Sequence, residues 1–182
     1  GYSNINAPGL IRVPEWVENP LGNYYLYFSQ YKGEVIRVAY ADKLSGPWKL
    51  HKPPVLDLQS SYFVKESPDL SSFDITKALY SRVSSTEFWT LYQTGSKEKE
   101  AAELKKSKGE LTLDRLKPYI SNSDIYVDEK TQEIRMYFHG LVEDGTQLSR
   151  VAVSEDGLTF TTLPKLIAGP NFKVFKLREL FY

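Results

Sequence analysis

The feature that most constrains the fold of this chain is an internal repeat, in which a segment near the N-terminus returns near the C-terminus. Tyr27-Phe28 in the first copy corresponds to Tyr137-Phe138 in the second, an offset of 110 residues. Arg37-Val38-Ala39 corresponds to Arg150-Val151-Ala152, an offset of 113 residues. Because repeats absorb insertions in their loops, the change of offset indicates a loop of different length in the two copies. The chain is therefore expected to build two similar units.

Short aromatic and β-branched runs in the first copy predict strands over 10–13, 24–28, 35–40 and 48–50. Turns that contain Gly or Pro separate these runs. Four antiparallel strands within about 45 residues match the size of one blade of a β-propeller. The second copy, over 124–166, repeats this pattern and is expected to form a second blade.

The sequence thus predicts an all-β fold and one domain over 1–182, organised as a partial propeller. The first blade is expected over 6–58 and the second over 119–166. Residues 167–182 are expected to start a further blade. Residues 59–118 are either a long insertion or a degenerate blade, and the sequence leaves both interpretations open.

Two or three blades are too few to close a ring, because each blade buries its faces against its neighbours and closure takes about four blades or more. We therefore expect the chain to be a fragment, or to associate with a second chain that completes the propeller. The chain begins with Gly1 and shows no signal peptide. The sequence does not fix the compartment, and a secreted or periplasmic location stays open.

Composition argues against several classes of partner. The chain has 23 basic and 23 acidic residues, whereas nucleic-acid binding calls for a basic face. No apolar run is long enough for a membrane span. With no Cys, there is no disulfide and no thiolate metal site. His51 and His139 are too few and too far apart to suggest a metal centre, and no Gly-rich phosphate loop is present. Neither a metal nor a cofactor is expected.

The sequence motifs of both copies are similar to those of a known group of proteins. The similarity is carried by NINAP (4–8), LIRVP (10–14), WVENPLG (16–22), YYLYF (24–28), AYAD (39–42), GPW (46–48), DI (124–125), RMYFHG (135–140), SRVA (149–152) and DGL (156–158). These runs resemble the five-bladed propeller proteins related to glycoside hydrolase families 43 and 32. The resemblance covers roughly 4–58 and 119–175 and leaves the middle uncovered. It implies a five-bladed propeller with a funnel on its axis and a carbohydrate, an oligo- or polysaccharide, as the partner.

Glycosidic cleavage needs an acid that protonates the leaving oxygen and a base or nucleophile on the other side. The resemblance implies an Asp at the start of the first blade, an Asp at the start of the second and a Glu at the third. The first position here is Asn6, whose amide cannot serve as a base. Asp124 fits the second position, and no Glu stands near 171–174. Asp69, in Ser67-Pro68-Asp69, is an alternative to Asp124 as the axial carboxylate.

Three more residues are candidates for sugar binding together with Asn6. Trp16, in a Pro-rich loop, either stacks on a sugar ring or packs on the next blade. His139, at the end of a buried strand, either binds sugar or is a hydrogen-bonded core histidine. Arg150 stands at the same repeat position as Arg37, which favours a structural contact with a carbonyl or carboxylate over a sugar contact.

Related sequences have His-rich segments after the position of Phe28 and before that of Asp124, where this chain has Tyr31 and Tyr119. One expected carboxylate out of three counts against hydrolysis by this chain alone. We therefore expect a glycoside-hydrolase-like propeller protein that acts on or binds a glycan. The alternatives are a non-catalytic carbohydrate-binding or interaction module, and an inactive fragment.

Overall fold

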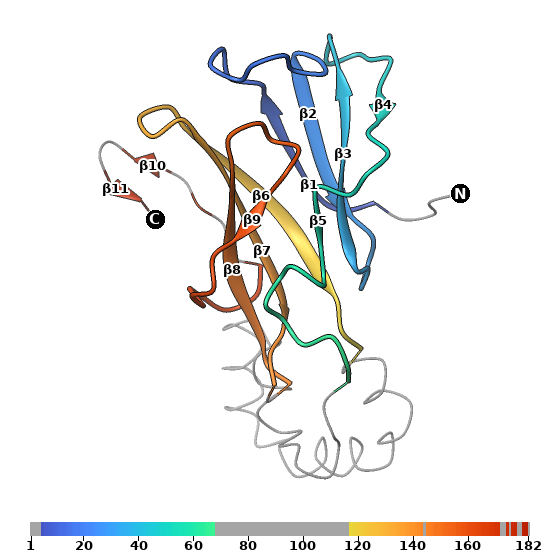
Figure 1. Cartoon of the computed structure of the whole chain (residues 1–182), viewed down its shortest axis with the longest axis vertical. Helices are drawn as coiled ribbons and strands as arrows, with labels where there is room; N and C mark the ends of the chain where they lie inside the picture. The colour runs from blue at the N-terminus through green and yellow to red at the C-terminus, as the bar shows by residue number, and fades with distance from the viewer. Residues whose placement is uncertain are drawn as a thin grey trace, which may run out of the picture.

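The structure, a computed structural model, describes residues 5–67, 117–143, 145–171, 174, 176–177 and 180–181. These residues form strands, turns and loops, and none of them is in a helix (Figure 1). The predicted all-β class is therefore confirmed. Accordingly, no helix among the described residues is long and apolar enough to cross a membrane. Most of the expected insertion, including Asp69, lies outside the described residues.

The first sheet is antiparallel and consists of β1 (Asn6–Arg12), β2 (Tyr24–Ser29), β3 (Val35–Ala41), β4 (Lys49–Leu50) and β5 (Leu56–Asp57). β4 and β5 both pair with β3, at opposite ends of it. Pro53 and Pro54 lie between them, and proline has no N–H to donate to a ladder. The outer strand is therefore interrupted at the two prolines. The sequence does not predict β5, because two residues are too few to show a strand pattern.

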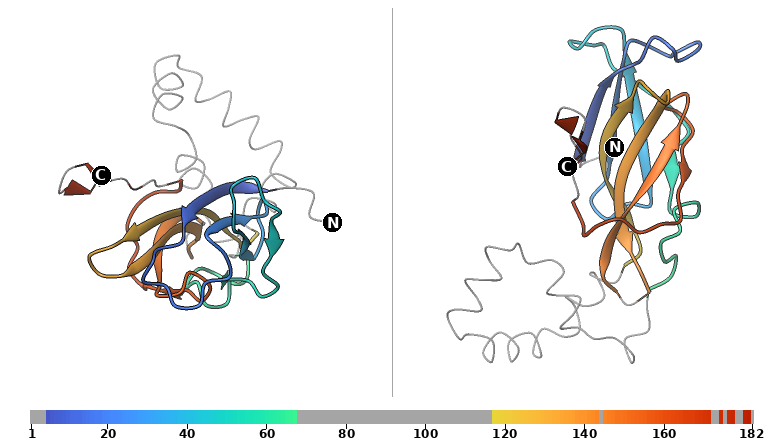
Figure 2. Two further views of the ribbon diagram at one scale, coloured as in Figure 1. Left: turned by 90° about the horizontal axis from the view of Figure 1, so that it is seen from above. Right: turned by 90° about the vertical axis from the view of Figure 1, so that its left-hand side faces the viewer.

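The second sheet has the same strand order and consists of β6 (Ile120–Asp128), β7 (Glu133–Leu141), β8 (Gln147–Ser154) and β9 (Thr161–Thr162). All of its neighbouring strands are antiparallel. The four strands expected in this copy are all present. Figure 2 shows the two sheets lying against each other, with β1 of the first beside β6 of the second.

The first strand of the first sheet contains a β-bulge close to its start. Asn6 pairs with Ser29, and the next pair in the ladder joins Gly9 to Tyr27. Ala7, inside the bulge, has a positive φ of 45°. A bulge adds residues to one strand only and changes the direction in which its side chains point. It therefore separates Asn6 from the regular part of β1.

The first strand of the second sheet contains the corresponding bulge. Ser121 pairs with His139, and the next pair joins Asp124 to Tyr137. Counted along the ladders, Ser121 is therefore the residue that corresponds to Asn6. The sequence alignment of Asn6 with Asp124 is wrong by three residues, because Asp124 lies beyond the bulge.

The two sheets share one apolar core. Its largest fully buried side chains are Tyr25, Tyr27, Ile36 and Val38 from the first sheet and Ile120, Ile134, Met136 and Phe138 from the second. The Tyr27 hydroxyl crosses between the sheets and donates to the carbonyl of Gly157 at 2.8 Å. Gly157 has a φ of +72°, and a Cβ there would lie 2.7 Å from that hydroxyl, so the close approach requires glycine. Phe160 completes the contact with an edge-to-face arrangement on Tyr27.

The outward face of the first sheet carries an apolar row that runs in register across its strands. The row consists of Leu10, Leu26, Ala39 and Leu50. The matching row of the second sheet consists of Ile125, Met136, Ala152 and Thr162. Leu50 is 43% exposed, whereas Thr162 at the equivalent position is 5% exposed. Leu26 is half-buried, whereas the equivalent Met136 is fully buried in the shared core. Equivalent ladder positions therefore differ in burial according to whether a second sheet covers them.

The chain beyond the second sheet does not continue as a regular strand over its first residues. Ala168 forms an isolated bridge with Ser149, and residues 169–171 form a turn. β10 (Lys176–Leu177) and β11 (Leu180–Phe181) pair as a separate two-stranded sheet. The described part of 167–182 thus returns toward the second sheet before it forms this hairpin.

Candidate functional site

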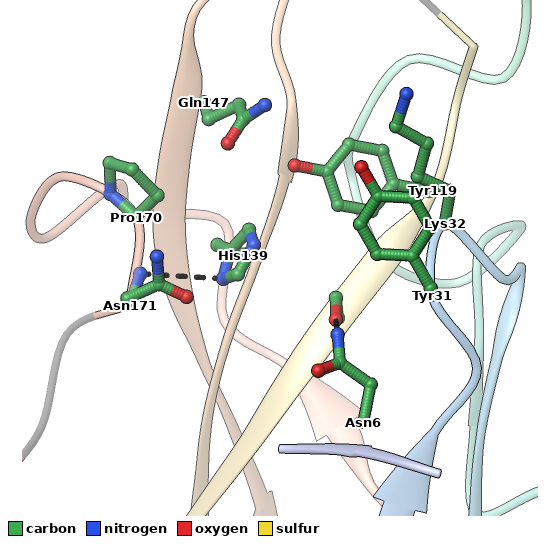
Figure 3. Close-up of a pocket in the computed structure, with 9 residues that line it drawn as sticks. Asn6, Tyr31, Lys32, Tyr119, His139, Gln147, Pro170 and Asn171 are labelled. Atoms are coloured by element: carbon green, nitrogen blue, oxygen red, sulfur yellow. Dashed lines mark hydrogen bonds between the residues drawn. The ribbon is translucent and has the colours of Figure 1, made fainter. Parts of the chain in front are cut away.

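A pocket of about 270 Å³ opens where the starts of β1 and β6 lie near the end of β7 (Figure 3). It is lined by Asn6, Tyr31, Lys32, Tyr119, Ser121, His139, Gln147, Pro170 and Asn171. Eight of these nine residues have a polar side chain, and none is Asp or Glu. The volume is just below the range of roughly 300 to 1,000 Å³ that is usual for small-molecule pockets. It suits a small polar ligand such as one sugar ring.

The turn between β2 and β3 brings Tyr31 and Lys32 to the pocket. The Gly33 N–H donates to the Gln30 carbonyl at 3.0 Å and closes the turn. Lys32 adopts a positive φ of 51° in this turn. The Gly33 carbonyl in turn accepts from the N–H of Ile120 at 2.9 Å. This hydrogen bond ties the turn of the first sheet to the beginning of β6 in the second.

Hydrogen bonds join the bulged ends of the two inner strands. The Asn6 side-chain amide donates from Nδ2 to the Ser121 hydroxyl at 3.2 Å. The hydroxyls of Ser121 and Ser29 lie 3.1 Å apart and share a hydrogen bond. An amide and two hydroxyls thus meet at the bulged starts of β1 and β6, and one of them, Asn6, stands at a position where the resemblance implies a carboxylate.

His139 lies at the end of β7, and its ring forms one wall of the pocket. The side chain is 6% exposed, and Nδ1 accepts a hydrogen bond from the Asn171 N–H at 3.4 Å. With Nδ1 as an acceptor, the proton of the neutral imidazole is on Nε2. The ring of Tyr119 packs against the imidazole edge to face, at 5.8 Å between centroids. His139 is therefore held in one orientation with a donor at Nε2.

Asp124 is half-buried on β6, beyond the bulge, and is not one of the residues that line the pocket. Its Oδ2 accepts from the Val174 N–H at 2.9 Å. The carboxylate thus holds the returning C-terminal segment against β6. The third position expected from the resemblance, near 171–174, contributes Asn171 to the pocket.

Arg150 lies on β8 and makes a structural contact outside the pocket. Its guanidinium donates to the carbonyl of Pro164, and from Nη2 to the carbonyl of Tyr62 at 3.1 Å. Burial lowers the pKa of Arg150, and the nearby Tyr62 partly opposes this effect. Arg37, at the corresponding position of β3, donates to the carbonyl of Lys52 at 3.2 Å. Both arginines thus make the carbonyl contact that their shared position in the sequence favours.

Trp16 lies at the ends of the sheets that are opposite to the pocket. Its indole Nε1 donates to Glu129 Oε2 at 2.8 Å. This bond links the loop after β1 to the turn after β6, at the top of Figure 1. Both strands begin at the pocket, so Trp16 is about one strand length away from it.

The structure therefore brings together two of the predicted site residues, Asn6 and His139, and places Asp124, Trp16 and Arg150 elsewhere. The sequence reasoning does not propose Lys32, Ser121, Gln147, Pro170 or Asn171 as site residues. Tyr31 and Tyr119 are notable in the sequence only because they stand where related proteins have His-rich segments. That departure marks two positions that do line the pocket.

No group of three or more His, Asp or Glu residues within the described ranges could hold a metal ion. The lining instead combines amides, hydroxyls, an imidazole and an ammonium group. Such groups can exchange hydrogen bonds with a ligand rich in hydroxyls. They do not include the pair of carboxyl groups that glycosidic hydrolysis uses.

The fold belongs to a class seen in a glycoside hydrolase. It is similar to that of a novel alpha-L-arabinofuranosidase of glycoside hydrolase family 43 from Clostridium thermocellum, with a TM-score of 0.50 and 15% sequence identity. The similarity covers 96% of this chain and 40% of the enzyme. It supports a fold like that of family 43, and the chain spans less than half of the length of this enzyme.

A closer match in sequence is an uncharacterized protein of Acanthamoeba polyphaga mimivirus, which is 30% identical over 169 residues. The match covers 88% of this chain and 35% of the viral protein. The chain thus spans about a third of the length of that curated relative. No protein-family model matches the chain.

Proposed function

We propose that this chain is a glycoside-hydrolase-like propeller protein whose pocket binds one residue of a glycan without hydrolysing it. The observation that carries the proposal is the pair Asn6 and Ser121 at the starts of β1 and β6, joined by a hydrogen bond of 3.2 Å. A glycosidase acts through two carboxyl groups placed about 5 to 10 Å apart. An amide and a hydroxyl supply neither the acid nor the base at neutral pH.

The lining residues supply the contacts that a sugar ring requires. The amides of Asn6, Gln147 and Asn171 each offer donors and an acceptor, which match sugar hydroxyls. Tyr31 is 62% exposed and lines the pocket with an aromatic face that suits the C–H groups of a sugar. Because the lining is mostly polar, it favours a hydroxylated ligand over an apolar one.

A second candidate function is hydrolysis with Asp124, or with Asp69 from outside the described residues, as the catalytic carboxylate. Asp124 is half-buried and lies three residues along β6 from Ser121. Its carboxylate is engaged by the Val174 N–H. If Asp124 is the catalytic carboxylate, it must reach a ligand in the pocket, and Asp124→Asn should abolish turnover. Turnover that persists in Asp124→Asn would assign the role to another carboxylate such as Asp69.

We further propose that the two sheets are adjacent blades of a five-bladed propeller, completed by association with a second chain or by further sequence. The apolar row on the outward face of the first sheet supports this proposal, because the matching row of the second sheet is covered. Sedimentation of the 182-residue chain tests it. A monomer that is soluble and melts cooperatively would contradict the incomplete ring.

The experiment that tests the binding function measures binding and turnover with one panel of oligosaccharides and aryl-glycosides. We expect saturable binding of at least one sugar and no release of product. Asn6→Ala is expected to weaken the binding, while Trp16→Phe, far from the pocket, serves as the matched control. Turnover that Asp124→Asn abolishes would establish the hydrolase instead, and absence of all binding would refute both functions.

A further inference from the structure

We propose that Asp124 is a positioning residue of the pocket, which fixes one wall of the pocket without touching the ligand. This wall belongs to the part of the chain after β9 that returns toward the second sheet. We call it the returning segment, described over 167–171 and at 174. Two of its residues, Pro170 and Asn171, line the pocket, whereas Asp124 does not. The inference rests on the proposed function, because it concerns sugar binding at the same pocket.

The first point at which the returning segment is fastened is Ser149, on β8. The Ser149 N–H donates to the Ala168 carbonyl at 2.8 Å, and the Ser149 carbonyl accepts from the Ile167 N–H at 3.0 Å. The Ser149 hydroxyl donates to the Gly169 carbonyl at 2.6 Å. Ser149 is 1% exposed and is not one of the residues that line the pocket. Its three hydrogen bonds hold the segment on the side that precedes the wall.

The next two points lie on the neighbouring strands, β7 and then β6. His139 Nδ1, on β7, accepts from the Asn171 N–H at 3.4 Å (Figure 3). Asp124 Oδ2, on β6, accepts from the Val174 N–H at 2.9 Å. Asn171 has a φ of +57°, a conformation that costs energy in residues other than glycine and persists where the surrounding structure fixes it. The bonds on both sides of Asn171 supply that constraint.

Asp124 is thus the anchor on the side that follows the wall. A hydrogen bond that a carboxylate accepts from a backbone N–H is shorter and stronger than one between neutral groups. Without it, the segment keeps its fastening at Ser149 and the longer bond at His139, and we expect the side beyond Asn171 to loosen. A pocket whose wall is in place in only a fraction of the molecules has its affinity reduced by that fraction. Sugar binding should therefore depend on a carboxylate that the sugar does not contact.

Titration of three variants tests the proposal, with the oligosaccharide of the panel that the parent chain binds most tightly as the probe. Asp124→Ala removes the acceptor and should weaken binding about tenfold or more, the effect of one hydrogen bond to a charged group. Asp124→Asn keeps an oxygen that can accept the Val174 N–H, so it should recover most of the affinity. Asp128→Ala, at the other end of β6, removes a carboxylate that accepts the Lys130 N–H, and should bind the probe like the parent chain.

Amide hydrogen exchange without sugar shows whether the wall itself responds. The N–H groups of Asn171 and Val174 should exchange faster in Asp124→Ala than in the parent chain, while those of the first sheet should be unchanged. Unchanged exchange at both residues, equal affinity of Asp124→Ala and the parent chain, or equal weakening by Asp124→Asn and Asp124→Ala would overturn the inference and leave the proposed function intact. Failure of the parent chain to bind any member of the panel would overturn both.

Discussion

The two sheets of this chain share one ladder but differ at the ends where their first strands begin. Both have a bulge at the start of the inner strand, followed by regular antiparallel pairing. Ahead of the bulge the first sheet has Asn6 and Ser29 paired, and the second has Ser121 and His139. The two sheets therefore keep the same ladder although different side chains stand ahead of the bulge. Three of these side chains, Asn6, Ser121 and His139, line the pocket, so the chemistry of the pocket can differ without a change of the strand framework.

The two sheets also differ in how much of their corresponding apolar rows is covered. Met136 in the second sheet faces the first sheet and is fully buried, while Leu26 at the same ladder position faces outward and is half-buried. Burial in this molecule therefore follows the position of the neighbouring sheet. Substitutions at paired positions should show how far the comparison holds.

The largest difference is expected for truncation at these two positions. Met136→Ala should lower the free energy of unfolding by about 2 to 5 kcal/mol, because it leaves a cavity in the shared core. Leu26→Ala should cost about 1 kcal/mol or less, because its side chain is already partly in water. Urea denaturation of both variants measures the difference, and equal losses would show that the outward row is covered in solution.

A smaller difference is expected at the tyrosines of the two second strands. Tyr27→Phe should cost about 1 to 2 kcal/mol, because it leaves the Gly157 carbonyl without its donor in a buried site. Tyr137→Phe should cost less, because Tyr137 has a side-chain hydrogen bond with Arg135, a partly exposed residue of its own strand that has other partners. Burial raises the pKa of both phenols, more strongly for Tyr27. The melting temperatures of the two variants measure this difference. A larger loss of stability in Tyr137→Phe than in Tyr27→Phe would contradict the comparison.

The turn after β8 should respond to pH. Asp156 accepts from the N–H groups of Leu158 and Thr159 at 2.8 and 2.9 Å. Burial alone would raise the pKa of Asp156, but these backbone bonds and the Ser154 hydroxyl outweigh it and lower the pKa below its usual 3.8. Asp156→Ala should therefore cost about 1 kcal/mol at pH 7.

The sign of this pH dependence follows from the lowered pKa. A carboxylate whose pKa is lower in the folded state stabilises the fold above the unfolded pKa and loses that effect as the pH falls through the folded value. The gap in melting temperature between the parent chain and Asp156→Ala should thus narrow below about pH 4. The β3–β4 turn has no such carboxylate bond, and a substitution of the exposed Lys43 there should give no comparable pH dependence. A constant gap would contradict this account.

The smallest effect is expected at the ends of the sheets far from the pocket. Glu129→Gln keeps an acceptor for the Trp16 indole on an exposed surface, and should change stability by less than about 0.5 kcal/mol. Sugar binding should not change at all. Weaker binding in this variant would move the site to the Trp16 end and would support the stacking role predicted for that residue.

The strands were predictable because runs of aromatic and β-branched side chains indicate extended structure. The aromatic run over 24–28 and the β-branched run over 35–40 give β2 and β3 to within one residue. The bulges were not predictable, since the positive φ falls on Ala7, a residue type that rarely adopts it, and not on the neighbouring Asn6 or Gly9. For that reason the similarity of the sequence motifs aligns Asp124 with Asn6, whereas the hydrogen-bond ladders align Ser121 with Asn6.

The pocket was predictable only in part, for a related reason. Asn6 and His139 stand at strand ends that sequence patterns locate, and both line the pocket. Lys32 comes from the turn after β2 and Gln147 is the first residue of β8, and their approach depends on packing that no local pattern encodes. Trp16 and Arg150 attracted attention by residue type, yet each is engaged in a structural bond elsewhere.

The central claim is that a sugar binds between the starts of β1 and β6. Backbone amide chemical shifts of the labelled chain, followed while a binding oligosaccharide is added, test it most directly. The account predicts that the shifts of Asn6, Lys32, Ser121, His139 and Asn171 change together along one saturation curve, and that no new product signals appear. Changes confined to the surroundings of Trp16 and Glu129, or signals of a cleaved sugar, would contradict it.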